Sequence, residues 1–130
     1  MKNIVFLCLF LFILAGSTAF GSTAITVTPA DSGKTITVRR GEIVRVELPS
    51  HGGTGFLWQA DPFDRAHLEL LTTESGNEHP NKMSGETVIS LWDFKAIQAG
   101  ETTLTMRLYR PWEGKEKAAE TFSVIIKILE

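Results

Sequence analysis

The residues whose types and spacing stand out chemically are Arg110, Pro111 and Trp112, which follow a strand-like run ending at Tyr109. Proline cannot donate a hydrogen bond to a sheet, so that strand must end here or lie at an edge. Trp112 is then expected on a loop, where a rigid, amphipathic indole is typical of a binding surface. The alternative is that Trp112 folds back over the core, and composition gives the two interpretations equal weight. Arg110 could pair with an acidic or aromatic group of a partner, or could be a solvated charge at a strand end.

A second stretch with unusual chemistry is the segment 50–55, which carries three glycines in six residues. Gly53 and Gly55 flank Thr54, so the main chain could approach a partner closely because little side chain lies in the way. Thr54 would supply a hydroxyl on a stiff, β-branched side chain. The alternative is an ordinary tight turn between two strands, which the residues by themselves favour.

Residues that could catalyse a reaction are present but lack a recognisable arrangement. No serine lies in a Gly-x-Ser-x-Gly setting, and the three histidines lack the spacing of metal ligands. The carboxylates in turns show no paired arrangement. We therefore expect a protein that is not an enzyme and that needs no cofactor and no metal. The residues considered are His51, His67, His79, Asp61, Asp64, Glu69 and Glu74.

The segments that would position these loops alternate apolar and polar residues with a period of two, and turn signals separate them about every ten residues. The pattern predicts an all-β fold, an immunoglobulin-like antiparallel β-sandwich of seven to eight strands. Pro49 is expected to end a strand, and residues 72–85 to form a long polar loop. The expected strands are 25–28, 34–38, 43–48, 56–60, 68–71, 86–96, 102–109 and 120–129.

Parity along these strands predicts the core. The 86–96 segment places alternate residues on one face, and so do the segments that end at Tyr109 and Leu129. Trp58 and Trp92 lie within strands and are expected in the core. The other predicted core residues are Phe56, Val88, Ser90, Phe94, Leu104, Met106, Leu108, Phe122, Val124, Ile126 and Ile128.

The N-terminal residues have the pattern of a secretory signal peptide. Lys2 precedes an unbroken apolar run at residues 4–14, which is too short to span a membrane. We expect a signal peptide over residues 1–24, cleaved after Ala19 or Ala24, with an uncleaved anchor as the minority alternative. This predicts an exported protein, periplasmic or secreted, with no membrane association after signal removal and one domain over residues 25–130.

Composition narrows the partners of that domain. The only cysteine, Cys8, lies in the apolar run, so the domain has neither a disulfide nor a thiol nucleophile. The chain has 13 Lys and Arg against 15 Asp and Glu, and loss of Lys2 leaves a net charge of −3. No basic patch stands out, so nucleic acid is not an expected partner.

Three segments occur in a distinctive order and spacing, namely residues 54–58 (TGFLW), 94–100 (FKAIQAG) and 110–113 (RPWE). Together they resemble the chagasin-like inhibitors of papain-family cysteine peptidases. The resemblance implies an immunoglobulin-like sandwich, a papain-family cysteine peptidase as protein partner, and a monomeric inhibitor. It also implies that three loops at one end form a wedge, which plugs the active-site cleft without being cleaved. Counting strands allows the three loops to share one end.

The resemblance also implies which residues contact the peptidase. The third loop matches the family fully at Arg110, Pro111 and Trp112, whereas the first loop keeps only the last two residues of the family motif Asn-Pro-Thr-Thr-Gly. Glycines in place of its proline and threonine predict a looser loop. His51 would add an imidazole near the thiolate–imidazolium pair of the peptidase, so we expect weaker or more pH-sensitive inhibition than from a member with the full motif. The second loop keeps one glycine of Gly-x-Gly-Gly. The first loop consists of His51, Gly52, Gly53, Thr54 and Gly55, and the second of Met83, Ser84 and Gly85.

Two other functions remain open from the sequence. An exported carbohydrate-binding or adhesion sandwich could use Trp112 to stack on a sugar ring. A component of a larger envelope assembly would also fit, because a fold does not fix a function.

Overall fold

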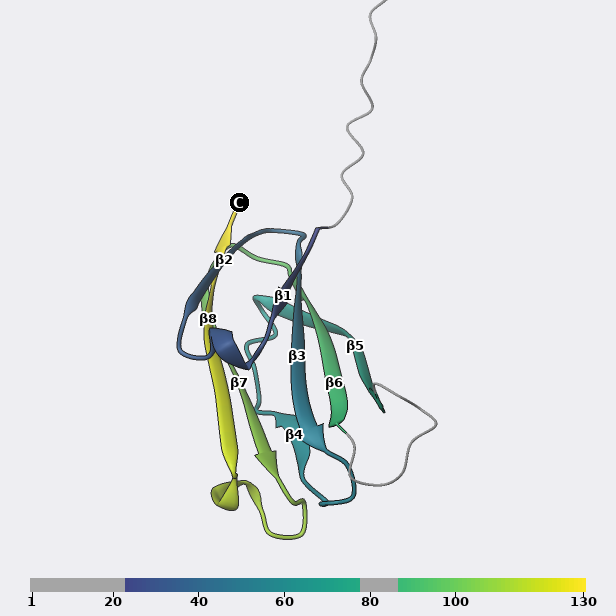
Figure 1. Cartoon of the computed structure of the whole chain (residues 1–130). Coiled ribbons are helices and arrows are strands. Elements are labelled where there is room, and N and C mark those ends of the chain that lie inside the picture. Colours follow the sequence, from purple (N-terminus) through teal and green to yellow (C-terminus); the bar gives the residue numbers. More distant parts are fainter. Residues whose placement is uncertain (1–22, 78–86) are drawn as a thin grey trace, which may run out of the picture.

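The structure, a computed structural model, describes residues 23–77 and 87–130. Eight strands and two short 3-10 turns occur in this part of the chain (Figure 1). The strands are β1 (Ala24–Val27), β2 (Thr35–Arg39), β3 (Ile43–His51), β4 (Leu57–Ala60), β5 (Leu68–Asn77), β6 (Thr87–Ala96), β7 (Gly100–Tyr109) and β8 (Glu120–Leu129), and the 3-10 turns are η1 (Pro29–Asp31) and η2 (Lys115–Lys117).

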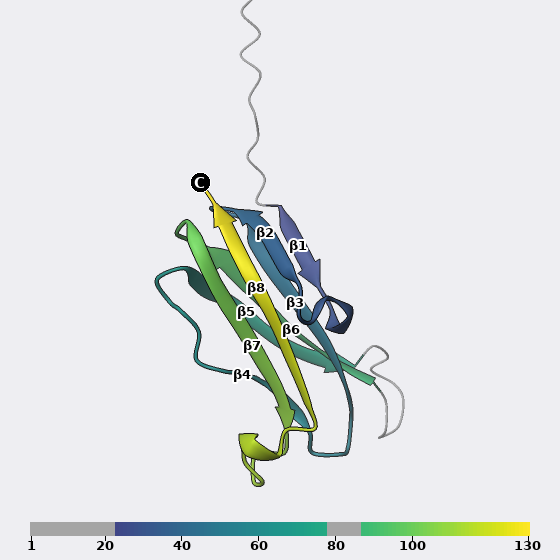
Figure 2. The same ribbon diagram turned by 90° about the vertical axis from the view of Figure 1, so that its left-hand side faces the viewer.

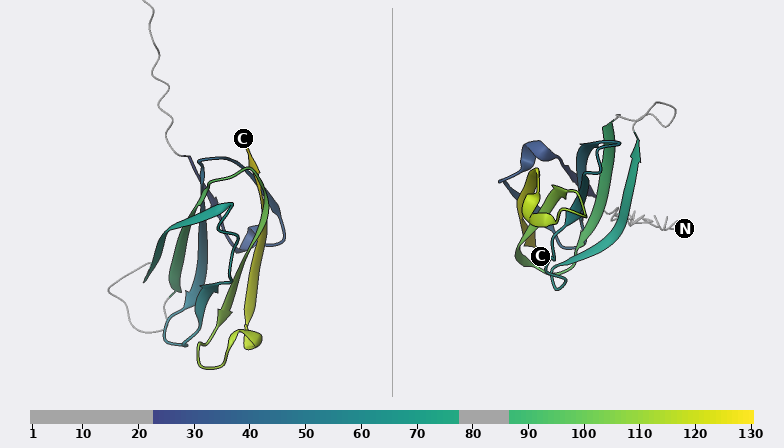
Figure 3. Two further views of the ribbon diagram at one scale, coloured as in Figure 1. Left: turned by 180° about the vertical axis from the view of Figure 1, so that it is seen from behind. Right: turned by 90° about the horizontal axis from the view of Figure 1, so that it is seen from below.

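The strands form two four-stranded sheets, which pack face to face as a β-sandwich (Figure 3). The order is β1-β3-β6-β5 in the first sheet and β2-β8-β7-β4 in the second. The predicted sandwich is confirmed, and its central ladders are antiparallel. The edge strands β1 and β2 instead pair in parallel, with β3 and β8 respectively. This leaves β1 and β2, which are consecutive in the chain, in different sheets.

The core lies between the sheets and follows the predicted parity. Trp58 and Trp92 are buried, as are Phe94 and the alternating residues of β7 and β8. Two predicted core residues, Phe56 and Val88, are only half-buried, and Phe56 packs against this core. The buried residues of β7 and β8 are Leu104, Met106, Leu108, Phe122, Val124, Ile126 and Ile128.

The prediction that Pro49 ends its strand is wrong. Strand β3 continues to His51, and Pro49 lies opposite Ile89 of β6. The Pro49 carbonyl accepts a hydrogen bond of 3.0 Å from the indole Nε1 of Trp58. In a strand the N and O atoms of one residue point to the same side, so the missing N–H faces Trp58 and not β6. Proline is tolerated here because β1 pairs with β3 only up to Val46.

The prediction of a long polar loop at residues 72–85 is wrong in its first part, because β5 runs on to Asn77. The ladder with β6 shifts its register between Leu70 and Thr72 and then continues to the end of β5. Residues 69–76 are exposed, so this part of the strand has no buried face. Its polar sequence shows no alternation for that reason.

The two ends of the sandwich differ in what they carry. One end, called here the loop end, holds the connection from β3 to β4 and the connection from β7 to β8 (Figures 1 and 2). Ala24, which pairs with Ile43, and Leu129, which pairs with Arg39, lie at the opposite end. In the described ranges, no helix is long and apolar enough to cross a membrane.

Candidate functional site

The third loop, residues 110–114, begins where β7 ends at Tyr109. The amide of Glu113 donates a hydrogen bond of 2.9 Å to the carbonyl of Arg110, which closes a four-residue turn. Pro111 takes the second position of this turn, where the fixed φ of proline is favourable. The next residue, Trp112, has 73% of its surface exposed. The prediction that Trp112 lies on a loop is confirmed, and the alternative that it folds back over the core is excluded by this exposure.

The first loop, residues 50–55, is built around Thr54. Its hydroxyl donates a hydrogen bond of 2.7 Å to the carbonyl of His51, across the glycine pair. Gly53 and Gly55 have φ angles of +79° and +80°, in the region that favours glycine. Thr54 thus braces a loop that lacks the proline of the family motif. His51 is exposed at the end of β3, opposite Thr87, the first residue of β6.

Arg110 joins the first loop to the third loop. Its Nε donates a hydrogen bond of 2.9 Å to the Thr54 carbonyl, and one terminal nitrogen lies 3.2 Å from the Glu113 carboxylate. The guanidinium carbon lies 4.4 Å from the centre of the Phe56 ring and 6.0 Å from that of Trp112, in the range of cation–π contacts. Arg110 therefore has partners within the protein, whereas a partner protein or solvent was expected from the sequence.

Gly55 is in close contact with the indole of Trp112. A Cβ atom built on Gly55 would collide with the end of the indole ring. Only glycine therefore lets the edge of the indole come this close to the first loop, and the positive φ of Gly55 adds a second reason for glycine. The first and third loops form one surface, with Trp112 exposed upon it.

The structure brings together eight of the eleven predicted site residues, those of the first and third loops. The other three, Met83, Ser84 and Gly85, lie outside the described residues. Two contributors were missed as site residues. Phe56 was placed in the core because of its predicted strand, and Glu113 was not assigned a role. The available signal was that Arg110 and Phe56, a basic and an aromatic residue, lie in two of the segments that match the family motifs and could form a cation–π pair.

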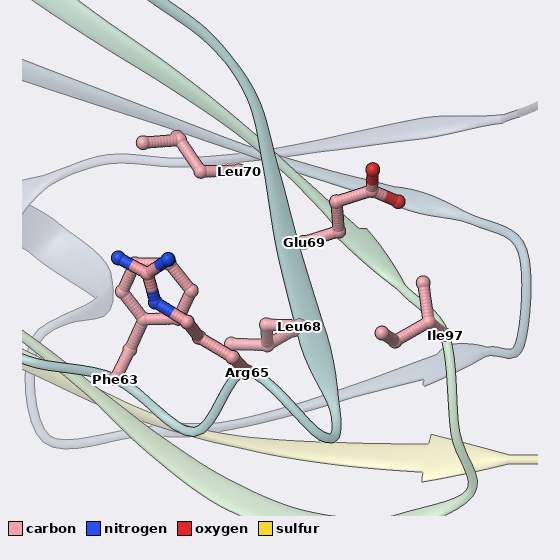
Figure 4. Close-up of a pocket in the computed structure, with 6 residues that line it drawn as sticks. All are labelled: Phe63, Arg65, Leu68, Glu69, Leu70 and Ile97. Atoms are coloured by element: carbon pink, nitrogen blue, oxygen red, sulfur yellow. The ribbon is translucent and has the colours of Figure 1, made fainter.

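A hollow of about 600 Å³ flanks the first loop. Its lining includes His51, Thr54 and Phe56, together with Leu108 and Ala119. A second hollow of about 480 Å³ lies near the opposite end, where the Arg65 guanidinium lies over the Phe63 ring at 5.5 Å (Figure 4). Leu68, Glu69, Leu70 and Ile97 complete its lining. The first hollow thus shares residues with the loop surface and the second does not.

Ionisable groups in the part of the chain that the structure describes form no site for a metal ion, since no three His, Cys, Asp or Glu side chains gather there. The Nδ1 atom of His67 lies 2.8 Å from the Asp64 carboxylate. The amide of Ala66 and the imidazole of His67 lower the pKa of Asp64. Because the Ala66 amide also bonds this carboxylate, at 2.9 Å, the Asp64–His67 pair is part of a tight turn between β4 and β5.

Comparison with known proteins adds to this geometry. The sequence model described as "Chagasin family peptidase inhibitor I42" matches residues 37–126. Chagasin from Trypanosoma cruzi is 31% identical over 104 residues, which cover 78% of this chain and 94% of chagasin. The cysteine protease inhibitor EhICP2 from Entamoeba histolytica has a similar structure, with a TM-score of 0.73, 20% identity and coverage of 82% of this chain and 96% of EhICP2.

A second solved structure is that of PbICP-C in complex with falcipain-2. PbICP-C aligns with a TM-score of 0.62 and 14% identity over 82% of this chain and 98% of its own. At these identities the two structures support the fold alone, while the sequence match over residues 37–126 shows the family. The resemblance read from the three segments is therefore confirmed: the chain belongs to the chagasin family of peptidase inhibitors and is not an enzyme.

Proposed function

We propose that the protein is a reversible inhibitor of papain-family cysteine peptidases and that its loop end occupies the active-site cleft. Two findings support a cysteine peptidase as partner. The chain belongs to a family of peptidase inhibitors, and its structural neighbour PbICP-C was solved in complex with falcipain-2. The proposal assigns the contacts to the first and third loops, with Met83, Ser84 and Gly85 of the second loop as further candidates.

The observation that carries this assignment is the exposed indole of Trp112 on a fixed base. Pro111 restricts the backbone before it, the turn from Arg110 to Glu113 is closed by a hydrogen bond, and the edge of the ring contacts Gly55. A large side chain that is ordered before binding loses little conformational freedom when it docks. Trp112 therefore has the properties of a binding hot spot.

The two loops would divide the work of binding. The first loop presents mainly main chain, because three of its five residues are glycines. His51 and Thr54 are the residues from 51 to 55 that have a side chain. Such a loop can enter a narrow space close to a catalytic centre, but it buries little apolar area. The third loop presents the indole. We therefore expect the third loop to supply more of the binding free energy than the first.

Arg110 would act mainly by positioning these loops. Its hydrogen bond to Thr54 and its stacking on Phe56 hold the third loop against the first. An arginine used in this way contributes to inhibition even without direct contact with the peptidase. The internal partners of Arg110 support this role over a salt bridge to the enzyme.

The test is an inhibition panel with papain and related enzymes, with unrelated serine peptidases as controls. Wild-type protein should inhibit the papain-family enzymes reversibly. Trp112→Ala should raise the inhibition constant at least tenfold, because truncating a docked indole costs ~2–4 kcal/mol. Leu129→Ala is the matched control, since Leu129 is also an exposed large apolar side chain but lies at the opposite end. Equal inhibition by Trp112→Ala and wild type would remove Trp112 from the site.

The exposed indole also leaves room for a carbohydrate ligand, because Trp112 could stack on a sugar ring. Retention of the wild-type protein on immobilised polysaccharides, lost in Trp112→Ala, together with no inhibition of any papain-family enzyme, would favour that function.

We further propose export directed by residues 1–24 and a monomeric mature inhibitor. The mass of the protein recovered from a cell that exports it would show whether cleavage follows Ala19 or Ala24. Sedimentation of the same sample would give its oligomeric state.

A further inference from the structure

The two ends of the first loop belong to different sheets. The chain leaves β3, which lies in the sheet β1-β3-β6-β5, and enters β4, which lies at the edge of the sheet β2-β8-β7-β4. Strand β3 pairs with β1 and β6, whereas β4 pairs with β7. In the described ranges no ladder joins β3 to β4, so main-chain pairing does not fix the separation of the two loop ends.

The side chain of Trp58 supplies a link between these strands. Its Nε1 donates a hydrogen bond of 3.0 Å to the carbonyl of Pro49, which lies near the end of β3, while Trp58 lies near the start of β4. Among the hydrogen bonds between described residues, this is the only one that joins the two strands. The first loop lies between the two partners, so the bond closes the base of that loop.

The two partners of this bond suit each other. Trp58 is only 6% exposed, and a buried indole N–H needs an acceptor. Strand β1 pairs with β3 only as far as Val46, so β1 does not reach the carbonyl of Pro49. The bond thus satisfies a buried donor with a main-chain acceptor that lies beyond the end of the neighbouring strand.

The first loop is therefore held at two points. Trp58 holds its base, and Arg110 holds its tip through the hydrogen bond of 2.9 Å to the Thr54 carbonyl. Between them, the bond of 2.7 Å from the Thr54 hydroxyl to the His51 carbonyl makes the turn a compact unit. Without the link at the base, this unit would move with β3 relative to the third loop.

We propose that Trp58 is a positioning residue for inhibition, because its indole N–H fixes the distance between the two ends of the first loop before the peptidase binds. This inference rests on the proposed function and gives a role to a buried residue that does not touch the peptidase. Burial in the core accounts for the ring of Trp58 but not for the donor directed at the base of the loop. A loop with three glycines gains most from such a constraint, since glycine loses the most conformational freedom when it is ordered.

The test compares Trp58→Phe with Trp92→Phe in the inhibition of papain. Trp92 is the matched control, because it is 5% exposed in the same core and its indole has no hydrogen bond to another described residue. Both variants keep an aromatic ring in the core, so thermal unfolding should show comparable destabilisation. Only Trp58→Phe should raise the inhibition constant, by about five- to tenfold.

The rate constants distinguish positioning from direct contact. Trp58→Phe should chiefly slow association, since only molecules with the first loop in place can dock. Trp112→Ala, which removes a contact, should chiefly speed dissociation. If Trp58→Phe does not fold, the Trp58 indole can be replaced by the isosteric benzothiophene, which carries sulfur in place of the N–H group and keeps the packing of the core. The same slower association is expected from that variant.

A second measurement needs no peptidase. Backbone order parameters and relaxation dispersion, measured by NMR at Gly52 and Gly53 of the free protein, should show more motion in Trp58→Phe than in wild type or in Trp92→Phe. Core loosening alone would affect the two variants alike.

The outcomes separate this inference from the proposed function. If wild type does not inhibit any papain-family enzyme, the proposed function fails, and the motion of Gly52 and Gly53 alone decides whether Trp58 positions the first loop. If wild type inhibits, but a folded variant without the Trp58 N–H group matches it in inhibition and in loop motion, the inference is overturned. Equal weakening of inhibition by Trp58→Phe and Trp92→Phe would overturn it as well, since the cause would then be a looser core.

Discussion

At the end opposite the loops, main-chain hydrogen bonds hold the turn between β2 and β3 to both sheets, whereas at the loop end two side chains make the long-range links. The amide of Arg40 donates a hydrogen bond of 2.7 Å to the carbonyl of Leu129 in one sheet. The amide of Gly41 donates one of the same length to the carbonyl of Ala96 in the other sheet. At the loop end, Trp58 reaches the Pro49 carbonyl of the facing sheet.

The second of those side-chain links is Arg110, which reaches the Thr54 carbonyl. Main-chain links survive most substitutions, because every residue except proline supplies the same groups. Side-chain links depend on a particular residue. The opposite end can thus keep the sheets together while the loop end varies, provided that Trp58 and Arg110 are retained.

The largest effect on this comparison is expected from Arg110→Ala. The variant loses the hydrogen bond to Thr54 and the stacking on Phe56, so both loops lose their relative position. The inhibition constant against papain should rise about thirtyfold, or ~2 kcal/mol, which is within the range for a hydrogen bond to a charged group. Unfolding in urea should change by less than about 1 kcal/mol, because Arg110 lies outside the core.

Arg39→Ala is the control for this variant, because Arg39 is exposed at the opposite end. It should leave inhibition unchanged. Arg110→Lys keeps the charge but has no planar group to stack and bond at once, so it should behave more like the alanine variant than like wild type. Full inhibition by Arg110→Lys would show that charge alone matters.

A smaller effect on inhibition is expected from substituting Gly55. Gly41 provides a closely matched control, because both glycines have a positive φ. Gly41 at the opposite end has a φ of +93° and open space around it, whereas Gly55, with a φ of +80°, contacts the edge of the Trp112 ring. Alanine should cost each ~1 kcal/mol in unfolding free energy from backbone strain. Gly55→Ala should also weaken inhibition about tenfold, because the indole must move. Equal inhibition by the two variants would mean that the contact between Gly55 and the Trp112 ring does not contribute to inhibition.

The smallest effect concerns the response of stability to acid. Arg45 forms two hydrogen bonds with Asp93, at 2.8 and 2.9 Å, on the outer face of the β3–β6 ladder. These bonds lower the pKa of Asp93 below its ordinary value of 3.8. The ionised pair therefore stabilises the protein above pH 3.8, and this contribution is lost as the pH falls toward the lower pKa of the folded state.

Asp93→Asn tests this response. The variant should be less stable than wild type at pH 7 by ~0.5–1 kcal/mol, and the difference should shrink in acid. Inhibition at pH 7 should be unchanged, since Asp93 belongs to the sheet and not to the loop end. A difference in unfolding free energy that stays constant between pH 7 and pH 2.5 would contradict the assigned role.

The parts of the fold that the sequence predicts well are those with one buried face. In β8, Phe122, Val124 and Ile126 alternate with outward residues, and the structure buries all three. The second half of β5 has no buried face, so its residues read as a polar loop. The parallel pairing of β1 with β3 leaves no local mark at all, because it depends on which strands meet in space.

The same distinction holds for the candidate site. Trp112 could be assigned to a loop because the adjacent Pro111 acts on the local backbone. The role of Arg110 could not be predicted, because its partner Thr54 is 56 positions away and the contact depends on the register of β4 with β7. Gly55 could not be distinguished from an ordinary turn glycine, because the side chain that it contacts, the indole of Trp112, is also distant in the sequence.

The positions of Ala24 and Leu129, both at the end opposite the loops, bear on how the protein can be attached to something else. A tether, a fused domain or a solid support joined near either residue would leave Trp112 facing away from the attachment point. The binding surface would then stay accessible without a long spacer. Several copies displayed on one particle would all project their loop ends outward, so their attachment would favour avidity over mutual obstruction.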